Sequence, residues 1–337
     1  MRISVVVIVY NLDTYIDQAI ESVLEQTRQA DEIIVVDDCS TDRSAERVKA
    51  YGHRLHYLRM PTNSGALLAA LRGVKAATGD VVCMLDGDDY WATNKLETVE
   101  RQFTANPNLG LLSHEHVRVD ERGTDLGVRD DTHRNIEDVR RRANSTGELS
   151  ALLRDSILAQ KGYWLGSAYS FRRKVLDVDK FERQVGTFGF DRLRQTYLDL
   201  VVAPFIVLTN PQGAIGYTPD TQFYYRIHDS GSLAGNVTPE KARESALKGR
   251  TINELIQLVL KENNADAAYL QRRERILLEY DFLCALYSGE NATAARLYMQ
   301  LAATHWSREQ LRKETKRFVA VMTLGPQRFL ELGQMLR

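Results

Sequence analysis

Apolar and polar residues follow one another in blocks over the first part of the chain, and the blocks predict strands that alternate with helices. Apolar runs stand at Ile3 to Val9, Ile33 to Val36 and Val81 to Leu85, with a weaker run at Leu55 to Met60. Short runs that are apolar throughout are typical of parallel strands buried on both faces. We therefore predict a series of parallel strands here.

Residues at helical spacing fill the intervals between these strands. One helix is predicted after the first strand, a second starts near Arg43, and a third follows the turn Asn63-Ser64-Gly65. The apolar stripe of the first helix comprises Ile16, Ala19, Ile20, Val23 and Leu24, and that of the third comprises Leu67, Ala70, Leu71 and Val74. Such alternation predicts an α/β fold with a right-handed, mostly parallel central sheet covered on both faces.

The middle of the chain continues with strands and helices around one charged excursion. Asp120 to Arg142 is rich in charge of both signs and poor in apolar residues, which predicts a mobile surface segment, either a functional loop or a plain insertion. Helices are predicted over Asn94 to Phe103, Glu148 to Leu158 and Leu193 to Val202, and strands over Leu109 to Val119, Tyr163 to Phe171 and Phe223 to His228.

Composition changes from Pro239 onward, where glycine becomes scarce and helix formers dominate. Apolar residues at helical spacing predict about two to four amphipathic helices in a hairpin or small bundle. They include Ile252, Leu255, Ile256, Val259, Leu260, Ile276, Leu277, Leu283, Leu297 and Leu301. We therefore divide the chain into an α/β domain, residues 1–237, and a C-terminal helical domain, residues 238–337.

Carboxylates stand where one predicted strand ends. The run from Val81 to Leu85 leads directly into Asp86, Asp88 and Asp89, with only Gly87 between them. Asp is unfavourable inside a strand, so these acids should lie at its tip, the edge where open α/β sheets bind ligands. Carboxylates this close repel one another unless a cation lies among them, and hard divalent ions often accompany phosphates. The stretch predicts a metal site that holds a nucleotide diphosphate, with a solvated acidic turn as the alternative.

The first and second predicted strands carry further polar residues at their tips, Tyr10 and Asp38. Because the tips of parallel strands share one edge, a nucleotide could stretch along it with its base near these two residues. Asp38 could accept a hydrogen bond from a pyrimidine N–H while the diphosphate reaches a metal near Asp88. The chain lacks G-x-G-x-x-G after the first strand and lacks a Walker A sequence, which disfavours a dinucleotide or P-loop site.

Composition narrows the class of protein. Lys and Arg total 44 against 45 Asp and Glu, a net charge of -1, so no nucleic-acid partner is expected. The three cysteines, Cys39, Cys83 and Cys284, lack metal-ligand spacing, which favours a reduced, cytoplasmic protein. No apolar run reaches the length of a membrane span, so we expect a soluble or only peripherally attached protein.

Several stretches in ordered succession resemble inverting glycosyltransferases of family 2, whose fold is called GT-A. They are Val5 to Asn11, Tyr15 to Thr27, Ile33 to Asp42, Asn63 to Gly65, Val81 to Trp91, Gly166 to Leu176 and Tyr224 to Ser232. Such an ordered set is far more specific than any single motif. The resemblance implies a GT-A (Rossmann-like) fold with a nucleotide-binding part over residues 1–119, an acceptor-binding part over residues 120–237, and a helical tail outside the match.

The resemblance also implies a role for each matching residue. Donor-binding positions are Ile8, Val9, Tyr10 and Asn11 beside the nucleobase, Asp38 on the base, Asn63 and Gly65 near the ribose or base, and Asp86, Gly87 and Asp88 of the D-x-D motif. Asp88 would hold Mn²⁺ or Mg²⁺, and His228 would complete the metal site, since imidazole suits transition metals. The alternative for His228 is a surface loop histidine.

Inversion at the anomeric carbon requires a carboxylate that takes the proton of the acceptor hydroxyl. In the resembling family this base is an Asp at the head of a helix that precedes the motif Tyr-Arg-x-His. The spacing of Asp199 from that motif is more like the family's, although Leu198 rather than an acid precedes it. Asp191 is the alternative base, or a helix N-cap.

Acceptor contacts are predicted at four positions. Trp91 and Trp164 could stack on a sugar ring, with core or edge packing as the equal alternative. Gly166 and Ser167 stand in a predicted strand where a ligand could approach closely.

The sequence therefore predicts a metal-dependent inverting glycosyltransferase. It would move a sugar from a UDP- or dTDP-linked donor to a hydroxyl of a glycan or lipid-linked glycan, in cell-surface polysaccharide synthesis. The alternatives are a non-catalytic nucleotide-sugar or glycan-binding module and a nucleotidyltransferase, although the Gly-rich basic loop usual in the latter is missing after the first strand. The helical tail could pack on the catalytic domain, form a homo-oligomer, recognise acceptor or contact the inner face of the plasma membrane.

Overall fold

A computed structural model describes residues 1–128, 131–160, 166–228 and 238–335 of the chain. The chain divides into two compact units, Met1–Gly231 and Ser232–Arg337. The sequence analysis places this division at residues 237 and 238. Each unit is described by itself below.

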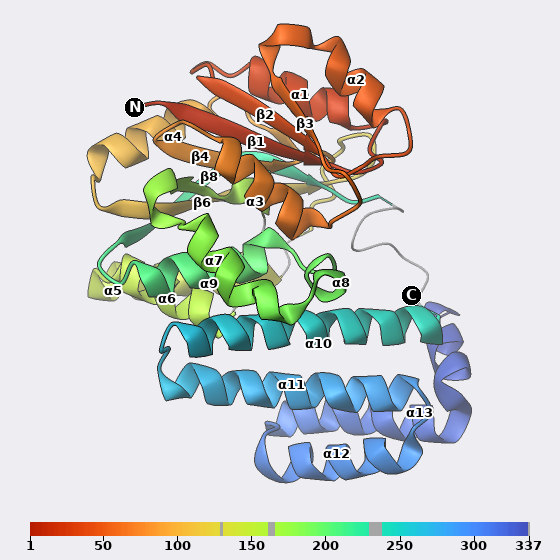
Figure 1. Cartoon of the computed structure of the whole chain (residues 1–337). Coiled ribbons are helices and arrows are strands. Elements are labelled where there is room, and N and C mark those ends of the chain that lie inside the picture. The colour runs from red at the N-terminus through yellow and green to blue at the C-terminus, as the bar shows by residue number, and fades with distance from the viewer. Residues whose placement is uncertain (129–130, 161–165, 229–237, 336–337) are drawn as a thin grey trace. The chain divides into compact units, whose positions relative to one another are not determined.

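A mixed sheet of eight strands, in the order β3-β2-β1-β4-β7-β6-β8-β5, forms the centre of the first unit (Figure 1). The strands are β1 Ile3–Val9, β2 Glu32–Asp37, β3 His56–Arg59, β4 Val81–Asp86, β5 Tyr90–Trp91, β6 Leu109–Val119, β7 Ser170–Arg172 and β8 Ala214–Arg226. Strands β1 to β4 are parallel, and β7 is antiparallel to both β4 and β6. Strand β8 is parallel to β6 and antiparallel to β5. The arrangement confirms the predicted fold class.

Successive residues of β1 serve opposite faces of the sheet. One face joins the core that contains residues of helix α1, Ile16–Leu24, and of helix α4, Lys95–Ala105. Helix α3, Ala66–Ala76, covers the other face so closely that a Cβ added at Gly73 would lie 2.3 Å from Val6 Cγ1. Burying a Val or Ile side chain completely contributes about 1.5–3 kcal/mol, so the fully apolar strands favour a sheet covered on both sides.

The other helices of this unit correct several predicted boundaries. They are α2 Ser44–Ala50, α5 Asp131–Thr146, α6 Leu149–Ala159, α7 Val178–Val185, α8 Phe190–Leu193 and α9 Leu198–Thr209. The segment predicted as a mobile excursion therefore contains helix α5. Its buried residues Ile136, Val139 and Ala143 have helical spacing, but charged neighbours dilute that pattern. The helix predicted over residues 193–202 begins at Leu198. Of the strand predicted over residues 163–171, residues 163–165 lie outside the described residues, Gly166–Ala168 form a short 3-10 helix instead, and only Ser170 and Phe171 belong to strand β7.

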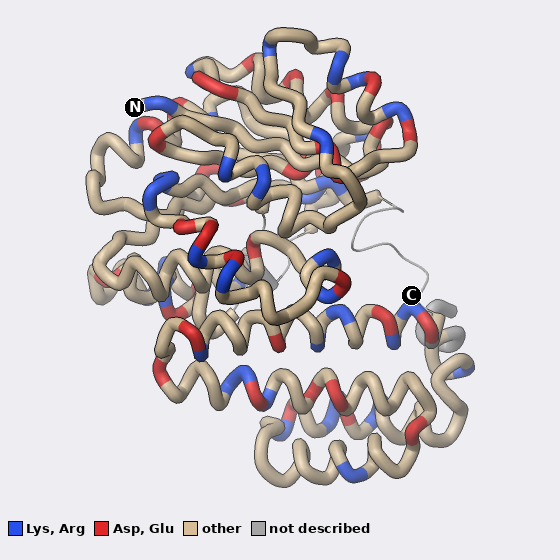
Figure 2. Tube along the Cα trace, in the orientation of Figure 1, with Lys and Arg blue, Asp and Glu red and all other residues tan. Residues whose placement is uncertain are grey.

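Four helices, α10 Pro239–Glu262, α11 Ala267–Tyr287, α12 Asn291–Thr304 and α13 Arg308–Met335, form the described part of the second unit. Side chains of the last three build a core of their own around Phe282. Thr238 and Asp266 accept backbone N–H groups and thereby cap α10 and α11. Helix α13 bends at Gly325, which has a φ of 77° and is followed by Pro326. Figure 2 shows charges of both signs along α10 and α11.

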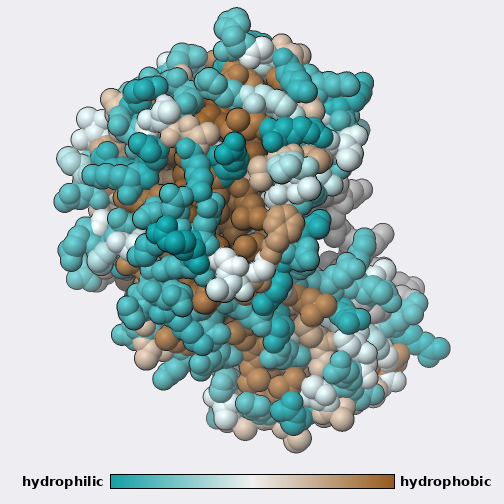
Figure 3. Space-filling model, viewed as in Figure 1, coloured by the Kyte–Doolittle hydropathy of each residue, from teal (hydrophilic) through white to brown (hydrophobic). Residues whose placement is uncertain are grey.

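The surface visible in Figure 3 is mostly hydrophilic, with smaller apolar areas between. None of the helices in the described parts of the chain is long and apolar enough to cross a bilayer.

Candidate functional site

The carboxyl ends of three neighbouring parallel strands form the site. The register pairs Val9 of β1 with Asp37 of β2, and Ile8 of β1 with Asp86 of β4. The backbone N–H of Gly87 then donates to the carbonyl of Ile8 at 2.8 Å, which holds the acidic turn against the end of β1. A Cβ at this glycine would lie 2.8 Å from the same carbonyl, so only glycine allows the approach.

The turn after β4 brings three carboxylates together. Asp86 stands at the strand end, and burial together with its neighbours Asp88 and Asp199 raises its pKa to about 8. Asp89 is buried, and burial together with the charges of Asp88 and Asp86 raises its pKa well above the usual range. Its Oδ2 accepts the Ser167 hydroxyl at 2.6 Å and its Oδ1 accepts the backbone N–H of Arg226 at 3.0 Å. Asp89 therefore anchors the turn inside the protein.

The side chain of Asp88 faces a histidine that follows strand β8. Its Oδ2 lies 3.0 Å from Nε2 of His228, which follows strand β8 and is 5% exposed. A carboxylate oxygen and an imidazole nitrogen at this separation, beside a second carboxylate, are suitable ligands for Mn²⁺ and a tolerable set for Mg²⁺. A cation bound here would also relieve the repulsion that raises the pKa of Asp86. The residues fit a divalent metal.

Arg226 connects β8 to the acidic turn and is almost completely buried. Its Nε donates to the Asp88 carbonyl at 2.9 Å, and its Nη1 donates to the Glu121 carbonyl at 2.7 Å. The guanidinium also lies over the Tyr15 and Tyr90 rings at 4.9 and 5.2 Å. Arg226 therefore positions the backbone of Asp88 rather than its carboxylate.

Asp199 lies in the first turn of α9 and adjoins the acidic cluster. Burial raises its pKa to about 7, although backbone N–H groups, including that of Gly166, bond to it and oppose the shift. Its charge acts on Asp86. Gly166 separates the two acids, because a Cβ there would lie 3.3 Å from Asp86 Oδ2. Asp191, the alternative base, lies on α8 with its side chain exposed.

Asp38 directly follows strand β2 at the same edge of the sheet. Its two carboxylate oxygens accept the backbone N–H groups of Ser64 and Gly65, each at 2.7 Å. Burial raises its pKa, and these two hydrogen bonds oppose the shift. Gly65 has a φ of +84°, and a Cβ there would lie 2.1 Å from the Arg194 carbonyl, so the segment after α8 packs directly on it. Asn63 is half-buried on the same loop.

The end of β1 presents one exposed aromatic ring. Tyr10 is 42% exposed, whereas Ile8 and Val9 are buried. Asn11 has a φ of 53°, and its side-chain oxygen accepts the backbone N–H of Thr41 at 2.8 Å. This hydrogen bond ties the loop after β1 to the loop after β2.

The predicted acceptor positions fall into different environments. Trp91 is 3% exposed and donates its indole N–H to the Ser167 carbonyl at 3.2 Å, so its ring faces the core and not a sugar. Ser167 is fully buried and anchors Asp89. The same carbonyl accepts Lys95 Nζ at 2.8 Å, and burial lowers the pKa of that lysine to about 7. Trp164 lies outside the described residues.

Sequence reasoning counted Asp89 only among the acids of the predicted metal site, and it assigned no role to Lys95 or Arg226. Asp89 was visible as the third acid of the turn, and Arg226 as the residue two places before His228. Lys95 gave no signal, because a lysine in a helix is ordinarily a solvated residue.

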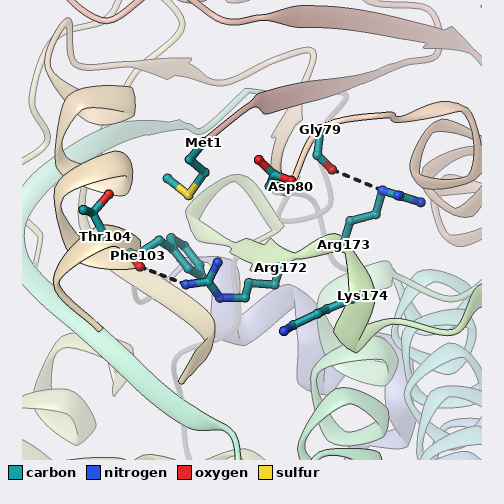
Figure 4. A pocket seen from close by; sticks show the side chains of 8 residues that line it. All are labelled: Met1, Gly79, Asp80, Phe103, Thr104, Arg172, Arg173 and Lys174. Atoms are coloured by element: carbon teal, nitrogen blue, oxygen red, sulfur yellow. Dashed lines mark hydrogen bonds between the residues drawn. The ribbon is translucent and has the colours of Figure 1, made fainter. Parts of the chain in front are cut away.

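A cavity of about 400 Å³ lies near the amino ends of strands β1 and β4, the ends opposite the acidic turn (Figure 4). Its lining includes Met1 and Gly79, which precede β1 and β4, and the basic run Arg172 to Lys174. Two of these cations are committed to carbonyls, because Arg172 donates to Phe103 at 2.8 Å and Arg173 donates to Gly79 at 3.1 Å. The cavity is separate from the acidic edge.

This fold and its acidic edge define a GT-A-type α/β protein. A family model described as glycosyl transferase family 2 matches residues 4–150. An uncharacterized glycosyltransferase of Nostoc sp. (strain PCC 7120) is 30% identical over 255 residues, which are 73% of this chain and 71% of that protein. The chain therefore belongs to glycosyltransferase family 2 and is a glycosyltransferase, as the sequence analysis predicts.

Other curated relatives share shorter stretches, between 28% and 36% of this chain and between 15% and 39% of their own lengths. Two solved structures share the fold. TarS of S. aureus, solved with UDP, has a TM-score of 0.54 at 21% identity and covers 92% of this chain and 77% of its own. The mannosyltransferase PcManGT of Pyrobaculum calidifontis, solved with GDP-Man and Mn²⁺, has a TM-score of 0.51 at 18% identity and covers 98% and 84%.

Proposed function

We propose that the chain is a metal-dependent inverting glycosyltransferase that moves a sugar from a UDP- or dTDP-linked donor to a hydroxyl of a glycan or lipid-linked glycan. The observation that carries the proposal is the meeting of Asp86, Asp199 and the pair Asp88 and His228 at one strand tip. The structural relatives support a nucleotide-sugar donor, because TarS has also been solved with UDP-GlcNAc and PcManGT binds GDP-Man.

The donor would lie along the strand tips. Asp38 keeps a lone pair on each carboxylate oxygen beyond the two backbone hydrogen bonds, so it can still accept a pyrimidine N–H. Tyr10 offers an exposed ring face beside the base, with Asn11, Asn63 and Gly65 around it. Asp88 and His228 would hold Mn²⁺ or Mg²⁺, which when bound stabilises the departing diphosphate. Asp86 would face the ribose or the sugar.

Asp199 would be the base. With a pKa of about 7, its carboxylate is partly ionised at neutral pH and can take the acceptor proton. The proton passes from the acceptor oxygen to Asp199 as that oxygen bonds to the anomeric carbon and the bond to the diphosphate breaks. Gly166 adds no side chain beside Asp86, where a Cβ would lie 3.3 Å from the carboxylate Oδ2.

The proposed cellular location of the enzyme rests on the family resemblance. We propose that the enzyme works in the cytoplasm, at the inner face of the plasma membrane, where it takes part in the synthesis of a cell-surface polysaccharide. Trp164 remains a candidate for stacking on the acceptor, while the burial of Trp91 removes it from this role.

Calorimetry and a transfer assay test the proposal together. UDP should bind the wild-type chain far more tightly with Mn²⁺ than without it, and Asp88→Asn should abolish that difference. Asp199→Asn should keep UDP binding and lose about 10²–10⁴-fold in turnover, the usual contribution of a general base.

The matched control is Asp191→Asn, which removes the exposed carboxylate on α8 and should leave turnover unchanged. Loss of turnover in this variant but not in Asp199→Asn would transfer the base to Asp191. Donor binding without turnover of any nucleotide sugar, across a panel of donors and acceptors, would favour a non-catalytic binding module.

A further inference from the structure

A second group of metal-ligating side chains lies on strand β6 and helix α5. Glu115 and His116 of β6 and His133 of α5 each offer one ligand atom, and these atoms all lie within 4.8 Å of one another. Glu115 Oε1 is 3.4 Å from His116 Nδ1 and 3.3 Å from His133 Nε2. None of the three residues belongs to the donor site described above.

A strand irregularity brings the two neighbours of β6 together. Adjacent residues of a regular strand point to opposite faces of the sheet. The register of β6 with β8 shifts between His114 and Glu115 and again between Glu115 and His116. Such a bulge changes the direction of a side chain, and bulges are common beside functional sites. The backbone here is arranged so that a carboxylate and an imidazole share one side.

The surroundings orient the carboxylate and shield the rings. Tyr217 donates its hydroxyl to Glu115 Oε2 at 2.7 Å, as an outer partner does for a metal-bound carboxylate. Although burial opposes it, hydrogen bonds from His116 and Tyr217 lower the pKa of Glu115 to about 2, so the carboxylate is ionised at neutral pH. The His116 ring is 3% exposed and lies 5.5 Å from the Phe223 ring.

The cluster can be reached from solvent, and it contains a ring nitrogen without a hydrogen-bond partner among the described residues. The Glu115 side chain keeps 21% of its surface exposed, which leaves a route to the cluster from solvent. His116 Nε2 is buried and has no hydrogen-bond partner among the described residues. A buried ring nitrogen without a partner is costly, and ring reorientation toward a bound ion would use it.

We propose that Glu115, His116 and His133 form a second metal site, for Zn²⁺ or a similar transition metal ion, distinct from the donor-site metal. Two imidazoles and one carboxylate select such ions over Mg²⁺ and Ca²⁺, which prefer oxygen ligands. The site joins α5 to the sheet, because His133 Nε2 lies 3.2 Å from the backbone carbonyl oxygen of His116 and 3.3 Å from Glu115 Oε1. Three protein ligands leave at least one coordination position for water or an acceptor group.

Metal analysis of the full chain tests this site. After chelator treatment and dialysis, the wild-type chain should take up one Zn²⁺ tightly, and Co²⁺ should give the visible absorption of a four- or five-coordinate nitrogen and oxygen site. His133→Ala and His116→Ala should lose both signals. His56→Ala, at an exposed histidine, should keep them, and so should Asp88→Asn, which removes the donor-site ligand.

A variant outside the ligand set protects the test against misfolding. Tyr217→Phe keeps all three ligands and should weaken Zn²⁺ binding by about 10–100-fold, the usual effect of removing an outer partner. Zn²⁺ should raise the Tm of the wild type more than that of this variant. Absence of tight Zn²⁺ binding by the wild type, or equal binding by folded His133→Ala, would leave the cluster as a hydrogen-bonded group and overturn the proposal.

Discussion

Half-buried carboxylates in close proximity give the site an electrostatic strain at the scale of single residues. The pKa of Asp86 is raised to about 8 because burial disfavours its charged form and the acids Asp88 and Asp199 lie beside it, whereas burial alone raises the pKa of Asp199 to about 7. The folded protein therefore holds protons that the unfolded chain releases near pH 4. Between about pH 4 and pH 8, the free energy of unfolding of the protein should therefore fall as pH rises.

The variant Asp86→Asn tests this linkage in the absence of metal. It should be more stable than the wild type at pH 8 by about 1–3 kcal/mol, and the difference should vanish at about pH 3 and below, where the wild-type carboxyl is protonated in both states. Urea unfolding in a chelator at both pH values measures it. Mn²⁺ should reduce the wild-type penalty at pH 8, and a pH-independent difference between the two proteins would contradict the account.

Gly65 combines two constraints in one residue, a positive φ and the contact with the Arg194 carbonyl. Gly65→Ala should lower stability by about 3 kcal/mol or more, because backbone must move, and should weaken UDP binding through Asp38. Gly52 is the matched control, since it has a φ of +60° with nothing within 4 Å. Gly52→Ala should cost about 1–2 kcal/mol by urea unfolding and leave UDP binding intact. Equal effects of the two changes would show that the contact is unimportant.

At the scale of elements, the acidic turn depends on strand β8, which lies far from it in the chain. Arg226→Gln removes a buried cation from the carbonyls of Asp88 and Glu121. We expect a loss of about 2–3 kcal/mol in stability and a weaker Mn²⁺ dependence of UDP binding. Calorimetry and urea unfolding measure these effects. Arg122→Gln, at an exposed position in the neighbouring turn, should change neither quantity.

Elements differed in how readily the sequence revealed them. Strands β1, β2 and β4 are apolar throughout, and so their positions and acidic tips could be predicted. Helix α5 was not predicted, because its few buried side chains stand among charges. The bulge in β6 could not be predicted either, since it arises from pairing with β8 about a hundred residues later.

At the scale of the whole molecule, each compact unit has a hydrophobic core of its own, one around β1 and the other around Phe282. We therefore expect residues 1–237 alone to fold, to unfold cooperatively and to bind UDP with Mn²⁺. Circular dichroism and calorimetry on the truncated chain test this expectation. Aggregation or loss of UDP binding would show that the helical unit is needed for the catalytic unit.

The local order of apolar and polar residues determined which segments become parallel strands and which acids stand at their tips, because strand burial and side-chain chemistry are properties of short stretches. It also carried the family resemblance, which the comparisons confirm. Only the tertiary structure decided that Ser167 and Arg226 hold the acidic turn, that His228 faces Asp88, and that Asp199 is half-buried near Asp86 whereas Asp191 is exposed. These contacts join residues distant in the chain, so their geometry and burial exist only once the chain has folded.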